Sequence, residues 1–508
     1  MTDTPFTTFE FPATGAPTPR TMPDRLAEIK NVVDFGADPL GGADSTSAIQ
    51  AAVDWTDGAD RGVIYFPLGA YKVSAPITFD YDGDLSICFR GEKGTNLFGN
   101  VDGYVFDRHF TSVTVTITIA SPGVVTETGH GRVADAPVKL STTGALPTGL
   151  VAGVTYYIKT VLSADTYTLS ATPGGTVIAT TGSQSGVHKR IANNTSGGRI
   201  FETLAIQNGS ATGGCIRLGS TIGGVIRNCG LGGFICLTTE DDVGVSSQNI
   251  SVDSCVIANN GTVDGSHYII IGGGGVIQGC TLSGADTGVR AYGSGLSIVG
   301  CRSERCNTSF LFGVDSGDNP VGLSGFIIEA VSTEGCWTAY DFGGAGGGLC
   351  DGFVVAGCGA LGHDSGNSGV VSGISGSQYG FRIRDDCARN GIFQGCTIGE
   401  YATVAGFSVG TASSRANLII REVSSTPGSG GGEFWEFPSN AYTARFYNTN
   451  ENPTWTYSQL PTGGDVLEGD EFDITDCNTA TWGATAAGSG SNHVKVRFNG
   501  TNYTVVGK

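Results

Sequence analysis

A short phrase ending in cysteine recurs along the middle of this chain of 508 residues and limits the possible folds more than any other feature. Each copy carries an inward apolar residue, an outward residue, a small turn residue and then the cysteine. The phrases end at Cys229, Cys255, Cys280, Cys301, Cys336, Cys358 and Cys396, at intervals of 26, 25, 21, 35, 22 and 38 residues. A unit of 21 to 26 residues, lengthened twice by insertions, is typical of a β-solenoid coil. The sequence therefore predicts stacked parallel coils with these cysteines in one buried column, about 4.8 Å apart.

A second strand follows the cysteine phrases, and its apolar residues alternate with a period of two. One face of this strand is therefore expected in the core and the other on the outside. The predicted inward column is Phe234, Val289, Phe310, Tyr340, Phe381 and Phe407. The predicted outward column is Arg290, Leu311, Asp341, Arg382 and Ser408, followed two residues later by Tyr292, Gly313, Gly343, Arg384 and Gly410.

The composition favours a folded solenoid over collagen or disorder. Glycine occurs 82 times without a Gly-X-Y period, while 39% of the residues are hydrophobic and 15% are charged. Several tight corners per coil use glycine at this rate. The 14 cysteines form no CxxC cluster, so we expect them to act as small buried hydrophobes rather than as metal ligands or disulfides. No phosphate loop or zinc spacing occurs either, so we expect no cofactor and no metal.

The charge and hydropathy exclude several classes of partner. The formal net charge is −19, and the 28 Lys and Arg residues form no basic run, which excludes nucleic acid as the partner. No stretch of about 18 apolar residues occurs, so no membrane insertion is expected. The first 20 residues lack the basic start and apolar core of a signal peptide, which predicts synthesis in the cytoplasm.

The segment from Val33 to Asp54 combines a turn-rich stretch with a short amphipathic helix. Asp44 or Ser45 is expected to cap this helix, whose Ile49, Ala52 and Val53 share one face. A strand, a Pro-Gly corner and a second strand follow in residues 62–73.

Together, residues 29–75 resemble the N-terminal cap of the pectate-lyase-like β-helix superfamily, in the version carried by phage tailspikes and tail fibres. The resemblance implies an all-β, right-handed parallel β-helix whose N-terminal helix plugs the open end of the solenoid. It also implies a homotrimer on the virion tail, made in the host cytoplasm and active outside it. Tail or baseplate proteins would contact its N-terminus.

The chain is expected to contain six successive parts. A virion-attachment or neck segment covers residues 1–29, and the cap with the first coils covers 30–108. An inserted small β domain is expected at 109–190, where β-branched residues are dense. The main coils cover 191–427, a linker covers 428–461, and a C-terminal β cap or trimerisation domain covers 462–508. The last of these contains a hairpin pattern with an Asn499–Gly500 turn.

The outward columns are the candidate site for a sugar polymer, because Arg, Tyr and Asp flank a glycine floor. Arg290, Tyr292, Arg382 and Arg384 are the expected substrate-binding residues. Hydrolysis needs two carboxylates, about 5–5.5 Å apart for retention or about 6.5–9.5 Å for inversion. Asp341 on the floor and Asp315 at the rim are the first candidate pair, and Glu304 and Asp386 are the reserves. An ion pair between Asp341 and Arg382 on the next coil is an equally weighted alternative.

These residues predict a tailspike that binds and depolymerises bacterial surface polysaccharide. Elimination from a uronic acid by a polysaccharide lyase is one alternative, with Arg290, Tyr292 or Arg382 as the base. Calcium, which pectate lyases of this fold hold in a carboxylate cluster, has no clear counterpart in the sequence. A non-catalytic receptor-binding or structural spike is another alternative, because function depends on the site and not on the fold.

Overall fold

The structure is a computed structural model. It describes residues 10–11, 20–21, 29–57, 61–79, 86–108, 112–191, 195–219, 221–240, 247–258, 265–344, 347–361, 379–385, 387–399, 407–409, 418–426, 435–436, 444–447, 454–460, 466, 468–469 and 471–507. Most of the expected neck (1–29) and linker (428–461), the loop 362–378, Asp386 and Gly410 therefore lie outside the described residues.

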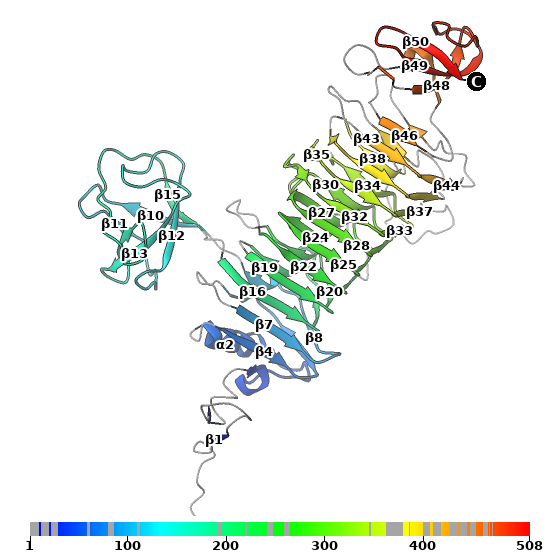
Figure 1. The fold of residues 1–508 in the computed structure, drawn as a ribbon. Helices are drawn as coiled ribbons and strands as arrows, with labels where there is room; N and C mark the ends of the chain where they lie inside the picture. Colours follow the sequence, from blue (N-terminus) through cyan, green and yellow to red (C-terminus); the bar gives the residue numbers. More distant parts are fainter. Residues whose placement is uncertain are drawn as a thin grey trace, which may run out of the picture. The chain divides into compact units, whose positions relative to one another are not determined.

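The chain divides into two compact units, and each contains coils of a right-handed parallel β-helix (Figure 1). The first unit comprises Met1–Cys229 and Thr238–Ile250, and the second comprises Gly230–Leu237 and Ser251–Lys508. The predicted fold class is confirmed. Two short strands, β1 (Glu10–Phe11) and β2 (Arg20–Thr21), pair with each other near the N-terminus.

Three parallel ladders make up the described coils of the first unit. The strands of these ladders are, in order, β3 (Ile29–Asn31), β4 (Arg61–Phe66), β7 (Ser86–Gly91), β16 (Thr195–Glu202) and β19 (Thr221–Arg227); β5 (Ala70–Val73), β8 (Asn96–Gly99) and β17 (Ala205–Asn208); and β6 (Ile77–Thr78), β9 (Tyr104–Arg108) and β18 (Gly214–Leu218).

Helix α2 (Thr46–Asp57) covers the start of these coils, after the short 3₁₀ helix η2 (Val32–Phe35). The Asp44 carboxylate accepts a hydrogen bond from the backbone N–H of Thr46, so Asp44 caps the helix. Ile49, Ala52 and Val53 are fully buried, as their spacing predicts. The helix contacts β3, β4 and β6, which is the position of a cap on the open end of a solenoid.

Three parallel ladders also make up the second unit, and we call them sheets I, II and III. Sheet I contains β22 (Ile250–Asp253), β25 (Gly275–Gln278), β28 (Leu296–Val299), β32 (Ile327–Glu329), β36 (Val354–Ala356), β40 (Ile392–Gln394), β43 (Leu418–Arg421) and β46 (Ala444–Tyr447). Sheet II contains β20 (Gly230–Gly232), β23 (Val256–Ala258), β26 (Thr281–Ser283), β29 (Arg302–Glu304), β33 (Ser332–Glu334), β37 (Gly359–Leu361), β41 (Thr397–Gly399) and β44 (Ser424–Thr426). Sheet III contains β21 (Ile235–Thr238), β24 (His267–Gly272), β27 (Thr287–Ser294), β30 (Thr308–Phe312), β34 (Thr338–Phe342), β38 (Tyr379–Ile383), β42 (Phe407–Val409) and β45 (Trp435–Glu436). A short side ladder of β31 (Leu323–Ser324), β35 (Cys350–Asp351) and β39 (Ala388–Arg389) adjoins β27.

The cysteine column exists, but the prediction that Cys336 belongs to it is wrong. The backbone N–H of Ser332 bonds to the carbonyl of Cys301, and that of Gly359 bonds to the carbonyl of Val331. Val331 therefore stands between Cys301 and Cys358, which changes the spacings there to 30 and 27 residues. Cys336 lies in a second column beside Cys306, because the N–H of Trp337 bonds to the carbonyl of Cys306.

All 14 cysteines are free thiols, and most of them are buried. Burial raises the pKa of the Cys336 and Cys350 thiols well above the usual value, which keeps both protonated and unreactive. The residue before the column cysteine has a left-handed backbone in successive coils, with φ of 53° at Asn228, 52° at Ser254 and 59° at Gly279. This conformation explains the recurring small turn residue.

Aromatic rings stack along the core of sheet III. Tyr340 lies 5.3 Å from Phe310 and 4.7 Å from Phe381, measured between ring centroids, and the rings are nearly parallel. The strand register confirms the predicted inward column from Val289 to Phe381, and Phe407 pairs with Phe381 on the next strand. The prediction that Phe234 begins this column is wrong, because Phe234 is only half-buried, whereas Leu237 on β21 is fully buried.

Residues 113–191 form a closed antiparallel barrel within the first unit. Its strands follow the order β10 (Val113–Ile117), β11 (Val124–Thr126), β14 (Thr166–Ser170), β13 (Thr155–Val161), β12 (Pro137–Thr142) and β15 (His188–Ile191). Apolar side chains fill it, and a buried carboxylate adds polar contacts. Glu127 accepts hydrogen bonds from Arg190 Nε and the Tyr167 hydroxyl, both at 2.8 Å.

The C-terminal residues form a four-stranded sheet with the order β47 (Thr454–Trp455), β48 (Glu471–Cys477), β49 (Asn492–Phe498) and β50 (Tyr503–Gly507). A short 3₁₀ helix, η3 (Tyr457–Gln459), follows β47. The side chain of Asn499 accepts hydrogen bonds from the N–H groups of Thr501 and Asn502 between β49 and β50. Among the described residues, no helix is long and apolar enough to cross a membrane.

Candidate functional site

The outer face of sheet III carries the charged residues that the sequence singles out. The register places Arg290, Leu311, Asp341 and Arg382 side by side on β27, β30, β34 and β38, as predicted. Backbone hydrogen bonds continue the second column, because the N–H of Gly343 bonds to the carbonyl of Phe312 and that of Arg384 to the carbonyl of Phe342. The parallel, in-register stack therefore brings together residues up to 94 positions apart, from Arg290 to Arg384.

Asp341 and Arg384 form a two-pronged ion pair at the centre of this face. Arg384 Nε lies 2.9 Å from one carboxylate oxygen, and Nη2 lies 2.7 Å from the other. The Asp341 side chain is 3% exposed and that of Arg384 is 28% exposed. Burial alone would lower the pKa of Arg384, but the hydrogen bonds and charge of Asp341 outweigh it and raise that pKa.

The predicted ladder pair between Asp341 and Arg382 is not observed. Arg382 lies directly opposite Asp341 in the register, but its guanidinium lies over the Tyr379 ring, 4.5 Å from the ring centroid. Arg384, two residues further along, reaches back diagonally to the carboxylate. A long side chain can choose a diagonal partner over the residue directly opposite.

Arg290 is the second buried charge on this face. Its Nη1 donates to the carbonyl of Asp315 at 2.6 Å and to the carboxylate of Asp318 at 2.7 Å. Within the described structure its Nε has no partner. Asp318 is largely exposed and has a φ of 59°, so a strained loop residue supplies the counter-charge.

His267, at the start of β24, was missed by the sequence reasoning. Burial and then the charge of Arg290 lower the pKa of His267 to about 4, against a smaller opposing effect of Asp318. The imidazole is therefore neutral at neutral pH, and its buried Nδ1 has no partner in the described part of the chain. The available signal was a histidine that opens the otherwise apolar run Tyr268–Ile271.

Asp315 stabilises a turn rather than facing a free space. One of its oxygens accepts the backbone N–H groups of Gly317 and Asn319, both at 2.9 Å, and the Asn319 amide contacts both oxygens. Burial alone would raise the pKa of Asp315, but these hydrogen bonds and the charge of Arg290 lower it below its usual value. An ionised carboxylate cannot serve as the acid of a hydrolytic pair.

Glu304 lies on another sheet and is not brought to Asp341. It sits on β29 in sheet II, where Arg302 contacts it at 2.6 Å and also pairs with Glu334.

Tyr292 is half-buried against Gly272 of the neighbouring coil. A β-carbon added to Gly272 would lie 2.5 Å from the Tyr292 ring and hydroxyl. Asp386 is outside the described residues.

The expected open, glycine-floored strip is instead covered. Taken as whole residues, Arg290 is 5% exposed, Leu311 7% and Asp341 2%. A β-carbon on Gly344 would lie 2.8 Å from Val314 and 3.2 Å from Leu311, so the chain after β34 packs directly onto the strip. The loop that contains Asp315 and Asp318 likewise contacts the buried Arg290.

A second polar cluster lies in the first unit, and the sequence reasoning also missed it. Asp107 on β9 and Arg217 on β18 are opposite each other and form a two-pronged pair with both distances at 2.6 Å. The guanidinium lies 4.9 Å from the ring centroid of Tyr104. Burial raises the pKa of the Tyr104 hydroxyl above its usual value. Among the described residues of the whole chain, no three His, Cys, Asp or Glu side chains group as a metal site.

Comparison with known families gives a match over more than half of the chain. Residues 29–311 match the family described as rhamnogalacturonase A/epimerase, pectate lyase-like. A segment of 44 residues is 52% identical to the mannuronan C5-epimerase AlgE3 of Azotobacter vinelandii. It covers 9% of this chain and only 2% of that epimerase.

Solved structures of the same fold include a phage protein and an epimerase. The tailspike of E. coli bacteriophage HK620 in complex with a pentasaccharide is 12% identical and has a TM-score of 0.47; the match covers 90% of this chain and 71% of that chain. The A-module of the mannuronan C5-epimerase AlgE4 of Azotobacter vinelandii is 12% identical with a TM-score of 0.44, and the match covers 83% of this chain and 94% of that chain.

Proposed function

Because this chain belongs to the rhamnogalacturonase A/epimerase, pectate-lyase-like family, we propose that it is a phage tailspike that binds bacterial surface polysaccharide and cleaves its glycosidic bonds. The resemblance of residues 29–75 to the cap of phage tailspikes supports the location on the virion tail. The proposed site is the outer face of sheet III around Asp341, Arg384 and Arg290.

The observation that carries this proposal is the set of buried charges on this face. A solenoid needs no charge at an outward position, and a buried ion pair is a weak source of stability because its desolvation offsets its attraction. Asp341 and Arg290 are nevertheless both buried, each with a specific charged partner. Buried and paired charges of this kind are candidates for functional groups.

The chemistry of the site assigns different roles to its members. Asp341, held by two donors of Arg384, is the carboxylate that would act as base or nucleophile. Because Asp341 is only 2% exposed, the polymer would have to displace the chain that covers it. Arg382 is half-buried and would bind the acidic groups or hydroxyls of the polymer. Asp315 stabilises the loop 315–319 through its hydrogen bonds and has no catalytic role in this proposal.

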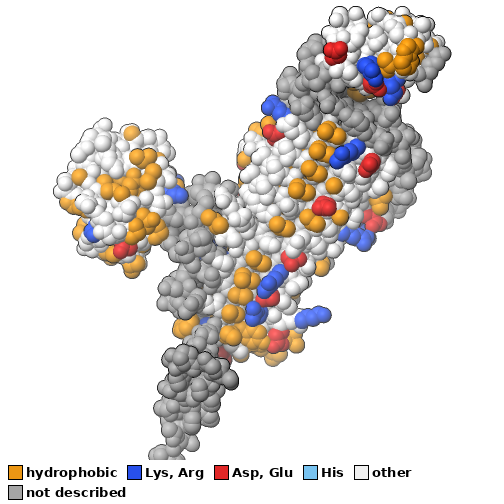
Figure 2. Space-filling view, in the orientation of Figure 1, with side chains coloured by type: hydrophobic (Ala, Val, Ile, Leu, Met, Phe, Trp, Pro, Cys, Tyr) orange, Lys and Arg blue, Asp and Glu red, His pale blue; other side chains and the backbone are white. Residues whose placement is uncertain are grey.

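An apolar stripe on sheet I supports a homotrimer. Its members are outward residues of successive strands, and Figure 2 shows hydrophobic side chains gathered in a line on this face. The register aligns Val276, Ile327, Val354, Ile392 and Ile419, with Ser297 between the first two. Ile327 is 44% exposed. A row of partly exposed aliphatic residues is suited to burial against other copies of the chain.

The test is digestion of purified polysaccharide from the host surface, followed by size analysis of the products. We expect shortened chains with the natural protein and none with Asp341→Asn. Glu304→Gln is the matched control, because Glu304 lies on sheet II and should leave cutting unchanged. Intact chains that still bind the protein would refute cleavage and support a spike that only adsorbs to its receptor.

Elimination is the second candidate reaction, and His267 is the observation that favours it. An imidazole that is neutral at neutral pH can accept a proton, although a pKa of about 4 makes it a weak base. The Arg290 guanidinium would neutralise a uronate carboxylate in place of that of Asp318. Products of elimination contain a carbon–carbon double bond and gain ultraviolet absorbance, whereas products of hydrolysis do not. Loss of that absorbance in His267→Gln would assign the base to His267; shortened chains without absorbance would exclude elimination.

A further inference from the structure

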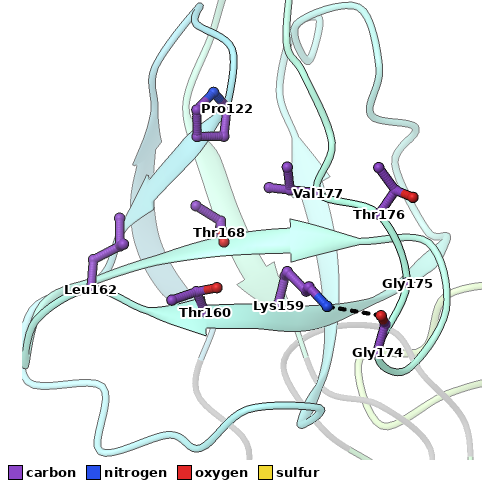
Figure 3. A pocket seen from close by; sticks show the side chains of 9 residues that line it. All are labelled: Pro122, Lys159, Thr160, Leu162, Thr168, Gly174, Gly175, Thr176 and Val177. Atoms are coloured by element: carbon purple, nitrogen blue, oxygen red, sulfur yellow. Dashed lines mark hydrogen bonds between the residues drawn. The ribbon is translucent and has the colours of Figure 1, made fainter.

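The barrel of residues 113–191 carries an open pocket that the proposed function does not use (Figure 3). Its volume is about 650 Å³, within the range of roughly 300–1,000 Å³ that is common for small-molecule sites. The lining combines Pro122, Leu162 and Val177 with Lys159, Thr160, Thr168, Thr176, Gly174 and Gly175. All of these residues belong to the barrel.

The Thr168 hydroxyl is the feature that points to a ligand. Thr168 is 3% exposed, and its Oγ has no hydrogen-bond partner within the described structure. Buried hydroxyl groups almost always have a partner, because an unmade hydrogen bond costs free energy. On β14, Tyr167 and Leu169 point into the barrel core, so Thr168 between them points to the outside, into the pocket.

A β-bulge places two further polar side chains beside Thr168. Ile158 pairs with Leu169 and Thr160 pairs with Thr168, so Lys159 is the extra residue on β13. A bulge re-aims the side chains next to it. Ile158 remains fully buried, while Lys159 and Thr160 both line the pocket. Figure 3 shows the two threonines on adjacent strands with Lys159 reaching toward Gly174.

The rim opposite these strands is held in place by hydrogen bonds. Lys159 Nζ donates to the carbonyl of Gly174 at 2.8 Å, and the N–H of Gly174 donates to the Asp135 carboxylate at 2.6 Å. The N–H of Gly175 also bonds to the carbonyl of Thr172 at 2.9 Å. The pocket is thus a built feature of the barrel, with an ammonium group already anchored at its edge.

We infer that this pocket binds a carboxylate-bearing sugar unit of a polysaccharide. The three threonine hydroxyls can donate to and accept from sugar hydroxyls, and Thr168 would then gain the partner that it lacks. Pro122, Leu162 and Val177 offer apolar surface to the C–H face of a sugar ring. Lys159 is the one charged residue of the lining, and no acidic residue lines it, which favours an anionic sugar over a neutral or cationic one. This site would hold the polymer independently of the site on sheet III.

The test uses the full-length chain on an array of acidic and neutral oligosaccharides from bacterial capsules and O-antigens. We expect retention on saccharides that carry uronic or sialic acids, and an at least about tenfold weaker signal for Lys159→Ala and for Thr168→Val. Lys189→Ala and Thr116→Val are the matched controls, since both residues lie on the barrel outside the pocket lining. Arg384→Met tests the separate site on sheet III.

Thr168→Val also has a stability readout. The substitution keeps the shape and removes an unpartnered hydroxyl, so its thermal unfolding temperature should be unchanged or higher while binding is lost. Binding profiles that are the same for the barrel variants and the natural protein would overturn the inference. So would a marked loss of stability in Thr168→Val, because the hydroxyl would then already have a partner. Retention on neutral saccharides alone would refute the acidic ligand.

Discussion

The pKa of His267 leads to a stability prediction whose sign and size follow from the structure. Burial, and then the charge of Arg290, lower this pKa to about 4, whereas a histidine in an unfolded chain has a pKa of about 6.5. Between these values the unfolded state binds a proton that the folded state does not. The free energy of unfolding therefore has its full value above about pH 6.5 and decreases as the pH falls toward about 4.

Each pKa unit corresponds to about 1.4 kcal/mol, so this single residue should lower the stability by about 3 kcal/mol across that window. His267→Gln removes the titrating group and with it the loss. A loss of 1 kcal/mol lowers the melting temperature of a domain of this size by about 2–4 °C. At about pH 4, the natural protein should therefore have lost at least about 6 °C more of its neutral-pH melting temperature than His267→Gln has.

The assay is thermal unfolding of both proteins by calorimetry at several pH values between neutrality and about pH 4. His493→Gln is the control, because His493 is exposed on β49 in the C-terminal sheet. If the melting temperatures of the natural protein and of His267→Gln fall in parallel as the pH is lowered, the reasoning is refuted. His267 would then take up its proton equally in the folded and unfolded states.

Three further predictions concern the same unit. Arg384→Met leaves a nearly buried carboxylate without its partner and should lower the free energy of unfolding by about 3–5 kcal/mol. Asp341→Asn leaves the more exposed guanidinium and should cost less; denaturant unfolding compares the two, and an equal or reversed order contradicts the argument. Ile327→Asp places a charge on the apolar stripe and should leave monomers in light scattering if the proposed trimer forms through this stripe, and a trimer that persists in the variant would place the interface elsewhere. Gly343→Ala puts a β-carbon 2.3 Å from that of Cys387 at a φ of 105°, so the melting temperature should fall by the equivalent of at least about 2 kcal/mol, and an unchanged value would contradict this packing.

The sequence by itself predicted the coil, the strand register and the cap. These features depend on short-range rules: a period of two along each strand, a left-handed residue before each column position, and an amphipathic helix before the first coil. In a parallel stack the same local rules repeat in every turn. The positions of Arg290, Asp341 and Arg382 beside one another could therefore be derived from spacing alone.

The membership of individual residues in a column required the tertiary structure where the coil length changes. Cys336 ends a phrase like that of its neighbours, but it belongs to the corner after sheet II, and Val331 takes its expected place. A buried position in a solenoid accepts any small or medium apolar side chain. The cysteine signal therefore does not identify the column by itself.

The candidate site was decided by contacts that no periodic pattern contains. The chain after β34 packs onto Leu311 on the outer face of sheet III, and Asp341 beside it is buried. The long side chain of Arg384, rather than that of Arg382, reaches the Asp341 carboxylate. Burial also makes His267 neutral, which its identity alone does not indicate. Periodicity specifies which backbone positions are adjacent; the desolvation and side-chain geometry that determine charge states arise only when loops from different coils pack together.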